Sequence, residues 1–301
     1  MDLSRVGKKS RLLILVLTRL LVIVFALCIT HLAYSYQAAG NIFKVAGLNA
    51  LVKIDLFTIV EKYQQQPIYA NYPKLRSQIS NNPYQKGIDG FNKIVTDIAQ
   101  QYITSFKNNI NQDKAKEYNL FYSIVIIKAD HHLIVGVRFE PLRGAYKTLN
   151  YDLTENKQIQ LSDLFIPNAN YLTLFSQYTD NLFFKNPDPV YKRMELPKGD
   201  KEVLLKMIRP DSVNYANWNV SQKGFFISFN NINIGSYTFY QNSVIPFSIL
   251  ENIIRPDSAI GCIASQGDPC IKLLLQSGGL QDIREFLRQP SPPELPQLST
   301  K

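Results

Sequence analysis

The sequence has few of the residues that most often carry catalysis or bind metal ions. Its 301 residues include three histidines and three cysteines, of which His31 and Cys28 lie within the first 35 residues. The other histidines, His131 and His132, are adjacent. On a strand, adjacent side chains point to opposite faces, so we expect a polar hairpin tip here and no shared metal site.

Catalytic and nucleotide-binding motifs are also lacking. There is no Gly-x-Ser-x-Gly elbow, phosphate-binding glycine loop, dinucleotide fingerprint or His-Glu-x-x-His pair. Asp152 and Asp163 are two carboxylates of the kind that glycosidases use, but a turn and a capping role account for both. We therefore predict no enzyme activity, no cofactor and no metal, and keep a peptidoglycan-directed hydrolase as an alternative.

The positive charge is too weak to indicate a nucleic-acid partner. The formal net charge is +9, but five of the 33 basic residues and one of the 24 acidic residues lie within residues 1–35. The rest of the chain has five more basic than acidic residues, and between residues 188 and 211 basic and acidic residues are interleaved. Such a surface attracts DNA or RNA poorly, so no nucleic-acid binding is expected.

The sequence does have a basic N-terminus followed by a long apolar run. Four basic residues precede Leu12–Cys28. Residues 1–35 are then either a cleaved signal peptide or a membrane anchor, with residues 12–34 as its single N-terminal helix. Both alternatives place the rest of the chain outside the cytoplasm, in the periplasm or secreted, because the positive cluster stays inside. Residues 36–50 would form a linker.

Cys262 and Cys270 flank a short segment that contains glycine and proline. In an oxidising compartment this spacing favours a disulfide that closes a loop. Two independent thiols are the alternative, and the absence of a nearby histidine argues against zinc.

The hydrophobic patterns predict an α+β fold, with a mostly antiparallel sheet and two amphipathic helices. The helices cover residues 88–110 and 171–184, and residues 186–201 are predicted to be an irregular excursion. The predicted strands cover residues 51–63, 68–72, 120–128, 133–140, 146–153, 158–161, 218–220, 224–230 and 243–247.

These elements suggest four parts beyond the linker. Residues 51–120 form an N-terminal hairpin-helix subdomain, and residues 121–254 form a C-terminal subdomain. Residues 255–288 hold the disulfide loop and a short helix. Residues 289–301 carry four prolines and are expected to be a disordered tail.

Seven segments between Leu51 and Asn252 occur in the order seen in one family of extracytoplasmic domains. They are Tyr72-Pro73-Lys74-Leu75, Phe91 to Phe106, Tyr122 to Ile127, Thr148 to Leu153, Leu161 to Phe165, Gly224 to Phe229 and Val244 to Leu250. The chain thereby resembles the RsiV-like and PdaC-like paired domains of unknown function. The resemblance implies a compact α+β domain outside the membrane. Many members have Gly-Gly-Ala-His where this chain has Arg143-Gly144-Ala145-Tyr146.

Function is predicted as recognition rather than catalysis. We expect a non-catalytic cell-envelope domain that binds an envelope protein or peptidoglycan, with a sensor component of a membrane signalling system as a further alternative. Aromatic side chains at Tyr237, Phe239 and Tyr240 are the predicted partner contact, since aromatic residues are enriched at binding surfaces. Residues 12–34 would contact the membrane if the leader is not cleaved.

Overall fold

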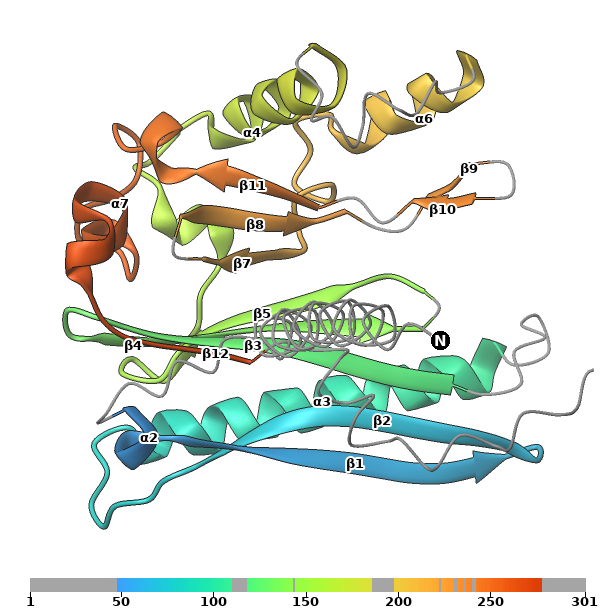
Figure 1. Cartoon of the computed structure of the whole chain (residues 1–301), viewed down its shortest axis with the longest axis vertical. Helices are drawn as coiled ribbons and strands as arrows, with labels where there is room; N and C mark the ends of the chain where they lie inside the picture. The colour runs from blue at the N-terminus through green and yellow to red at the C-terminus, as the bar shows by residue number, and fades with distance from the viewer. Residues whose placement is uncertain are drawn as a thin grey trace, which may run out of the picture.

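The computed structural model describes residues 48–109, 118–142, 144–185, 198–221, 223–229, 232–234, 237–239 and 242–277. They form an α+β fold with a mixed, mostly antiparallel sheet, as the sequence predicts (Figure 1). The predicted leader, most of the linker and the C-terminal tail lie outside these residues and stay predictions. Within the described ranges, no helix has the length and apolar character needed to cross a membrane.

The larger sheet has seven strands. Six of them follow in the order β1 (Lys53–Tyr63), β2 (Gln66–Arg76), β3 (Tyr118–Ala129), β4 (His132–Pro141), β5 (Lys147–Asp152) and β6 (Lys157–Gln158). The pairs are antiparallel except β2–β3, which is parallel over three residues at the start of β3. The seventh strand, β12 (Ile271–Ser277), pairs with the other half of β3, from Ile124 to Ala129. One edge of β3 is thus shared by β2 and β12.

Helix α3 (Gln85–Asn109) lies between the β1–β2 hairpin and strands β3–β5, so the sheet curls around it (Figure 1). Phe91, Val95 and Ile103 recur on one side of the helix and are fully buried. The side-chain amide of Asn92 fixes α3 to β2, because it accepts from the Leu75 N–H at 2.7 Å and donates to the Leu75 carbonyl at 2.8 Å. A four-residue helix, α2 (Leu48–Leu51), precedes β1.

The second sheet contains β7 (Trp218–Val220), β8 (Gly224–Ser228) and β11 (Asn242–Pro246), all antiparallel. Helices α4 (Tyr171–Asp180) and α6 (Lys198–Met207) lie over it, as Figure 1 shows. A π-helical turn, η2 (Asn181–Lys185), continues α4, and β9 (Ile232–Ile234) and β10 (Tyr237–Phe239) form a separate hairpin. Shorter helices are η1 (Leu161–Leu164), η3 (Phe247–Ile249), α7 (Gly261–Gln266) and η4 (Asp268–Cys270).

Two apolar cores lie on opposite faces of the larger sheet. Strand β4 contributes to both, because side chains alternate along a strand: Leu133, Val135 and Val137 face the α3 core, and Ile134 faces the core under the second sheet. The second core is rich in aromatic rings, with Phe225 contacting Phe175 at a centroid distance of 5.5 Å. Strand β3 runs across residues 120–121, where the sequence predicts a subdomain boundary.

Most predicted elements are present, and two differences have local causes. The irregular excursion predicted for residues 186–201 is wrong at its end, because α6 begins at Lys198; residues 186–197 lie outside the described ranges. Strand β12 was not predicted, because Ile271–Ser277 lacks the two-residue alternation of a half-buried strand.

Candidate functional sites

The β3–β4 hairpin tip holds a buried histidine–carboxylate pair. His132 Nδ1 lies 2.6 Å from Asp152 Oδ2, and the Asp152 side chain is fully buried. The other Asp152 oxygen accepts from the backbone N–H groups of Thr154 at 2.9 Å and Glu155 at 3.2 Å. Burial raises the pKa of Asp152, but the hydrogen bonds from His132 and the amides outweigh it, so the net pKa is lowered.

The two adjacent histidines do not point to opposite faces, and that expectation is wrong. Their ring centroids lie 3.9 Å apart. The reason is that His131 belongs to the turn rather than to a strand, since Ala129 pairs with His132 and Asp130 has a positive φ of 48°. His131 Nδ1 lies 2.8 Å from Asp130 Oδ2 at the exposed tip, and this hydrogen bond lowers the pKa of Asp130.

The contacts around the His132–Asp152 pair are those of a structural pair rather than a catalytic one. The Thr154 hydroxyl donates to the His131 carbonyl at 3.1 Å and accepts from the Leu133 N–H at 2.9 Å, so it is already engaged. Among the described residues, no group of three His, Cys, Asp or Glu side chains could hold a metal ion. The pair can hold β4, β5 and the following turn together.

Asp152 and Asp163 take different places in the structure. Asp152 forms the predicted turn, with its carboxylate directed to His132 and two amides. Asp163 is exposed in η1, whose N-cap residue is Gln160 and has no side-chain cap hydrogen bond. The predicted capping role of Asp163 is therefore not formed.

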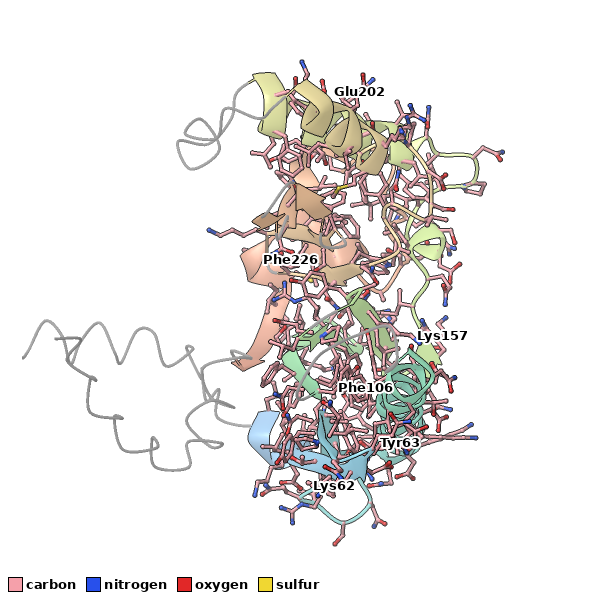
Figure 2. The ribbon with its side chains drawn as sticks, turned by 90° about the vertical axis from the view of Figure 1, so that its right-hand side faces the viewer. Lys62, Tyr63, Phe106, Lys157, Glu202 and Phe226 are labelled. Carbon is pink, nitrogen blue, oxygen red and sulfur yellow. A yellow bond between two sulfur atoms is a disulfide. The ribbon has the colours of Figure 1, made fainter. Side chains whose placement is uncertain are left out.

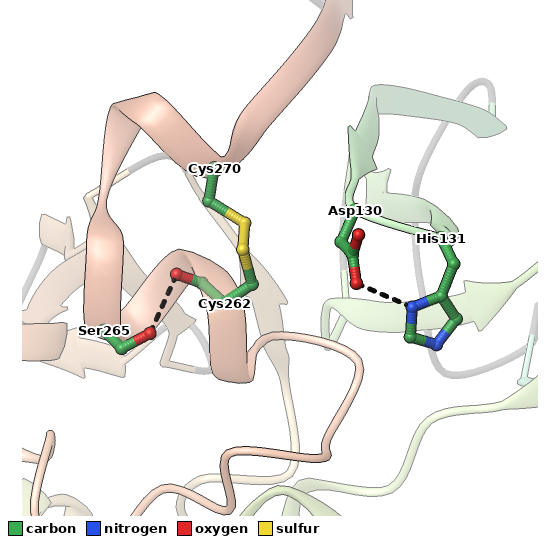
Figure 3. The surroundings of a disulfide bond; sticks show 5 residues. All are labelled: Asp130, His131, Cys262, Ser265 and Cys270. Atoms are coloured by element: carbon green, nitrogen blue, oxygen red, sulfur yellow. Dashed lines mark hydrogen bonds and ion pairs between the residues drawn. A yellow bond between two sulfur atoms is a disulfide. The ribbon is translucent and has the colours of Figure 1, made fainter.

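Cys262 and Cys270 are joined in the predicted disulfide, with their Cα atoms 5.8 Å apart. The bond links α7 to the start of β12. Figure 3 shows it beside the Asp130–His131 turn, in agreement with the pairing of Ile271 with Ala129. The disulfide thus lies where β12 begins its pairing with β3.

A pocket of about 470 Å³ lies at the C-terminal part of α3, against the start of β3 and the segment before β5. Its lining residues are Ile98, Gln101, Tyr102, Ser105, Phe106, Tyr118, Gly144, Ala145, Tyr146 and Lys147. Figure 2 places Phe106 in the half of the molecule that contains Tyr63, away from Phe226 and Glu202. No histidine, cysteine or carboxylate is among these lining residues.

Aromatic rings form the floor of this pocket, which we call the α3 pocket. Phe106 and Tyr118 are each 6% exposed and stack with centroids 4.6 Å apart. Burial raises the pKa of Tyr102 and of Tyr118, so both phenols are neutral donors at physiological pH. The Tyr102 hydroxyl donates to the Ala145 carbonyl at 2.9 Å and fixes the segment before β5.

The mouth of the α3 pocket is polar and carries positive charge. Lys147 and Gln101 are exposed, and the Lys147 ammonium donates to the Gln101 side-chain oxygen at 2.9 Å. The neighbouring Arg138 lies 5.6 Å from the Tyr146 ring centroid, but its charge is matched by Glu140 at 2.6 Å. Among the described residues at the mouth, Lys147 therefore supplies the positive charge.

The predicted aromatic contact lies only partly within the described residues. Tyr237 and Phe239 are in β10, which pairs with β9, and Tyr240 is outside. Figure 1 shows the β9–β10 hairpin extending beyond β8 and β11. Its role as a partner contact stays a prediction. The α3 pocket was not predicted, because its residues come from three segments; the only sequence signal was Tyr146, at the departure from the family turn.

The chain is distantly similar to a deacetylase of the cell wall. No protein-family model matches it. It is 20% identical over 207 residues to the peptidoglycan-N-acetylmuramic acid deacetylase PdaC of Bacillus subtilis (strain 168). The match covers 67% of this chain and 42% of PdaC, so the chain spans less than half the length of that relative. The predicted resemblance to PdaC is confirmed as a distant sequence similarity.

A solved structure also aligns with the chain. It is a DUF3298 family protein from Pseudomonas aeruginosa PAO1, with a TM-score of 0.42 and 12% identity. The alignment covers 68% of this chain and 95% of that protein.

Proposed function

We propose that this chain is a non-catalytic recognition domain that acts outside the cytoplasm and binds a component of the cell envelope. The observation that carries the proposal is the α3 pocket, which is open and aromatic, and whose described lining residues include no histidine, cysteine or carboxylate. Volumes of roughly 300–1,000 Å³ are typical of ligand sites. A lining with neutral phenols, an amide and an ammonium group suits binding rather than acid–base catalysis.

Two observations support a location outside the cytoplasm. The disulfide between Cys262 and Cys270 is a bond that persists in oxidising compartments. The similarity to PdaC, whose name describes action on peptidoglycan, agrees with the basic and apolar N-terminus. Because the chain spans less than half of PdaC, its deacetylase activity is not carried over.

The alternative is a hydrolase that acts on peptidoglycan. The observation in its favour is the His132–Asp152 pair, since a carboxylate often orients a catalytic histidine. Against it, His132 is largely buried and the nearby Thr154 hydroxyl is engaged with the His131 carbonyl. For a sensor role, the described residues offer no specific observation.

The test is co-sedimentation of the purified protein, residues 36–301, with insoluble peptidoglycan, together with capture of envelope proteins. Sedimentation with peptidoglycan or capture of a defined envelope protein is expected, and release of reducing sugar is not. A protein that binds neither contradicts the proposal. Release of reducing sugar that disappears in His132→Gln would instead support the hydrolase.

A further inference from the structure

We propose that the α3 pocket binds an acidic pyranose unit of an envelope glycan, with the sugar ring on the tyrosine side chains and its carboxylate at Lys147. This inference rests on the proposed function and names the ligand class of the same site. Three features of the pocket carry it: its size, the pairing of aromatic and polar groups, and the sign of its charge.

Size favours a sugar over a folded protein. A stable protein–protein interface buries at least about 1,200 Å² in total, usually on a rather flat surface. The α3 pocket is a single concavity of about 470 Å³, within the range of small-ligand sites. One or two sugar units of a longer polymer can enter such a space while the polymer continues outside it.

The chemistry of the walls also matches a pyranose. A pyranose ring has an apolar face of C–H groups and an equatorial rim of hydroxyls. The pocket offers aromatic surface from Tyr102, Phe106 and Tyr118, with donors at its mouth. The phenol hydroxyls of Tyr102 and Tyr118 add polar groups to this aromatic surface. A sugar hydroxyl can hydrogen-bond with a phenol hydroxyl, which an alkyl chain cannot do.

The charge selects an acidic sugar. Lys147 is exposed at the mouth and donates to the neutral Gln101 amide, whereas Arg138 nearby is paired with Glu140. Since no carboxylate is among the described residues that line the pocket, a ligand carboxylate would meet the Lys147 ammonium group without repulsion from them. Gln101 remains beside it to bind a hydroxyl or amide of the sugar.

The experiment measures the binding of three soluble probes to the purified protein, residues 36–301, by saturation-transfer NMR and calorimetry. The probes are an N-acetylglucosamine–N-acetylmuramic acid disaccharide with a free lactyl carboxylate, digalacturonate and neutral chitobiose. We expect transfer to the ring protons of both acidic probes and weaker binding of chitobiose. Preference for the muramyl probe assigns the ligand to peptidoglycan, and preference for digalacturonate assigns it to another acidic polysaccharide; both support the inference.

Matched variants locate the binding site. Lys147→Ala should weaken binding of the acidic probes by about tenfold, and Lys157→Ala, an exposed lysine on β6, should not. Gln101→Ala should weaken binding of all probes, while Gln100→Ala, its exposed neighbour on α3, should not. All four side chains are exposed, so thermal unfolding is expected to be unchanged.

Two results overturn the inference and separate it from the proposed function. Equal affinity of Lys147→Ala and the unchanged protein for acidic probes, while peptidoglycan still sediments the protein, removes the α3 pocket as the site but keeps envelope binding. If no probe shows saturation transfer while the protein still captures an envelope protein, the ligand is a protein partner and not a glycan.

Discussion

Asn150 and Asn219 join the two sheets through their side chains: Asn219 Nδ2 donates to Asn150 Oδ1 at 3.2 Å, and both residues are buried. Asn150 Nδ2 donates in turn to the Trp218 carbonyl at 2.7 Å. Asn219 also donates to the Val137 carbonyl at 3.2 Å. The contact therefore ties β7 of the small sheet to β4 and β5 of the large one.

Replacing Asn150 should destabilise the protein strongly. Asn150→Ala leaves the buried Trp218 carbonyl and Val220 N–H without these partners, which should lower the free energy of unfolding by about 2–3 kcal/mol. Urea unfolding monitored by fluorescence of Trp218, the single tryptophan, measures the loss. Asn108→Ala, at an exposed position of α3, is the control. Equal stability of the two variants would show that the amide contact does not join the sheets.

The His132–Asp152 pair should make stability depend on acid pH. The folded-state pKa of Asp152 lies below its ordinary value of 3.8, so its contribution is complete above that pH and is lost as pH falls through the lowered value. Asp152→Asn removes the contribution and should cost about 2 kcal/mol at neutral pH. Chemical unfolding at several pH values measures the free energy of unfolding of both proteins. The difference in this free energy between Asp152→Asn and the unchanged protein should become smaller below pH 3.8.

The control for this experiment is Asp130→Asn, because Asp130 makes a similar contact to His131 at the exposed tip, where water screens the interaction. A difference that is constant across the acid range for Asp152→Asn would contradict the proposed linkage.

The disulfide should stabilise the pairing of β12 with β3. Cys270 directly precedes β12, so a double Cys262→Ser, Cys270→Ser variant releases the constraint and should cost about 2–4 kcal/mol. Hydrogen exchange should then quicken at the β3 amides opposite β12, near Ile126, while β1–β2 amides keep their protection. Mass spectrometry of unreduced peptides checks the bond itself. Free, alkylatable thiols at both positions would contradict the assignment.

Local sequence patterns predicted the parts of the fold that depend on near neighbours. The spacing of Phe91 and Val95 indicated α3, and the polar residues between the apolar runs indicated the β3–β4 turn. The same patterns could not show that β12 joins the edge of β3, because that pairing brings together residues far apart in the chain. They gave no sign of the parallel contact between β2 and β3 either.

The candidate sites illustrate the same limit. Sequence spacing was sufficient for Cys262 and Cys270, which are close along the chain. The sequence indicates His132 and Asp152 as separate polar positions and not as a pair, because their contact depends on the register of β4 against β5. The α3 pocket requires a helix, a strand start and a loop to converge, and no local pattern encodes that convergence.

The β9–β10 hairpin gives a second surface whose role can be separated from the α3 pocket. The sequence predicts that Tyr237 and Tyr240 contact a partner, and the β9–β10 hairpin extends beyond β8 and β11 (Figure 1). The double substitution Tyr237→Ala, Tyr240→Ala should reduce capture of an envelope protein without lowering the unfolding temperature, and Thr238→Ala should leave capture unchanged. Because the hairpin and the α3 pocket are separate parts of the fold, the double variant should still bind the acidic sugar probes. Unfolding of the double variant would instead mean that these rings stabilise the fold, and the surface would then be rejected as a contact site.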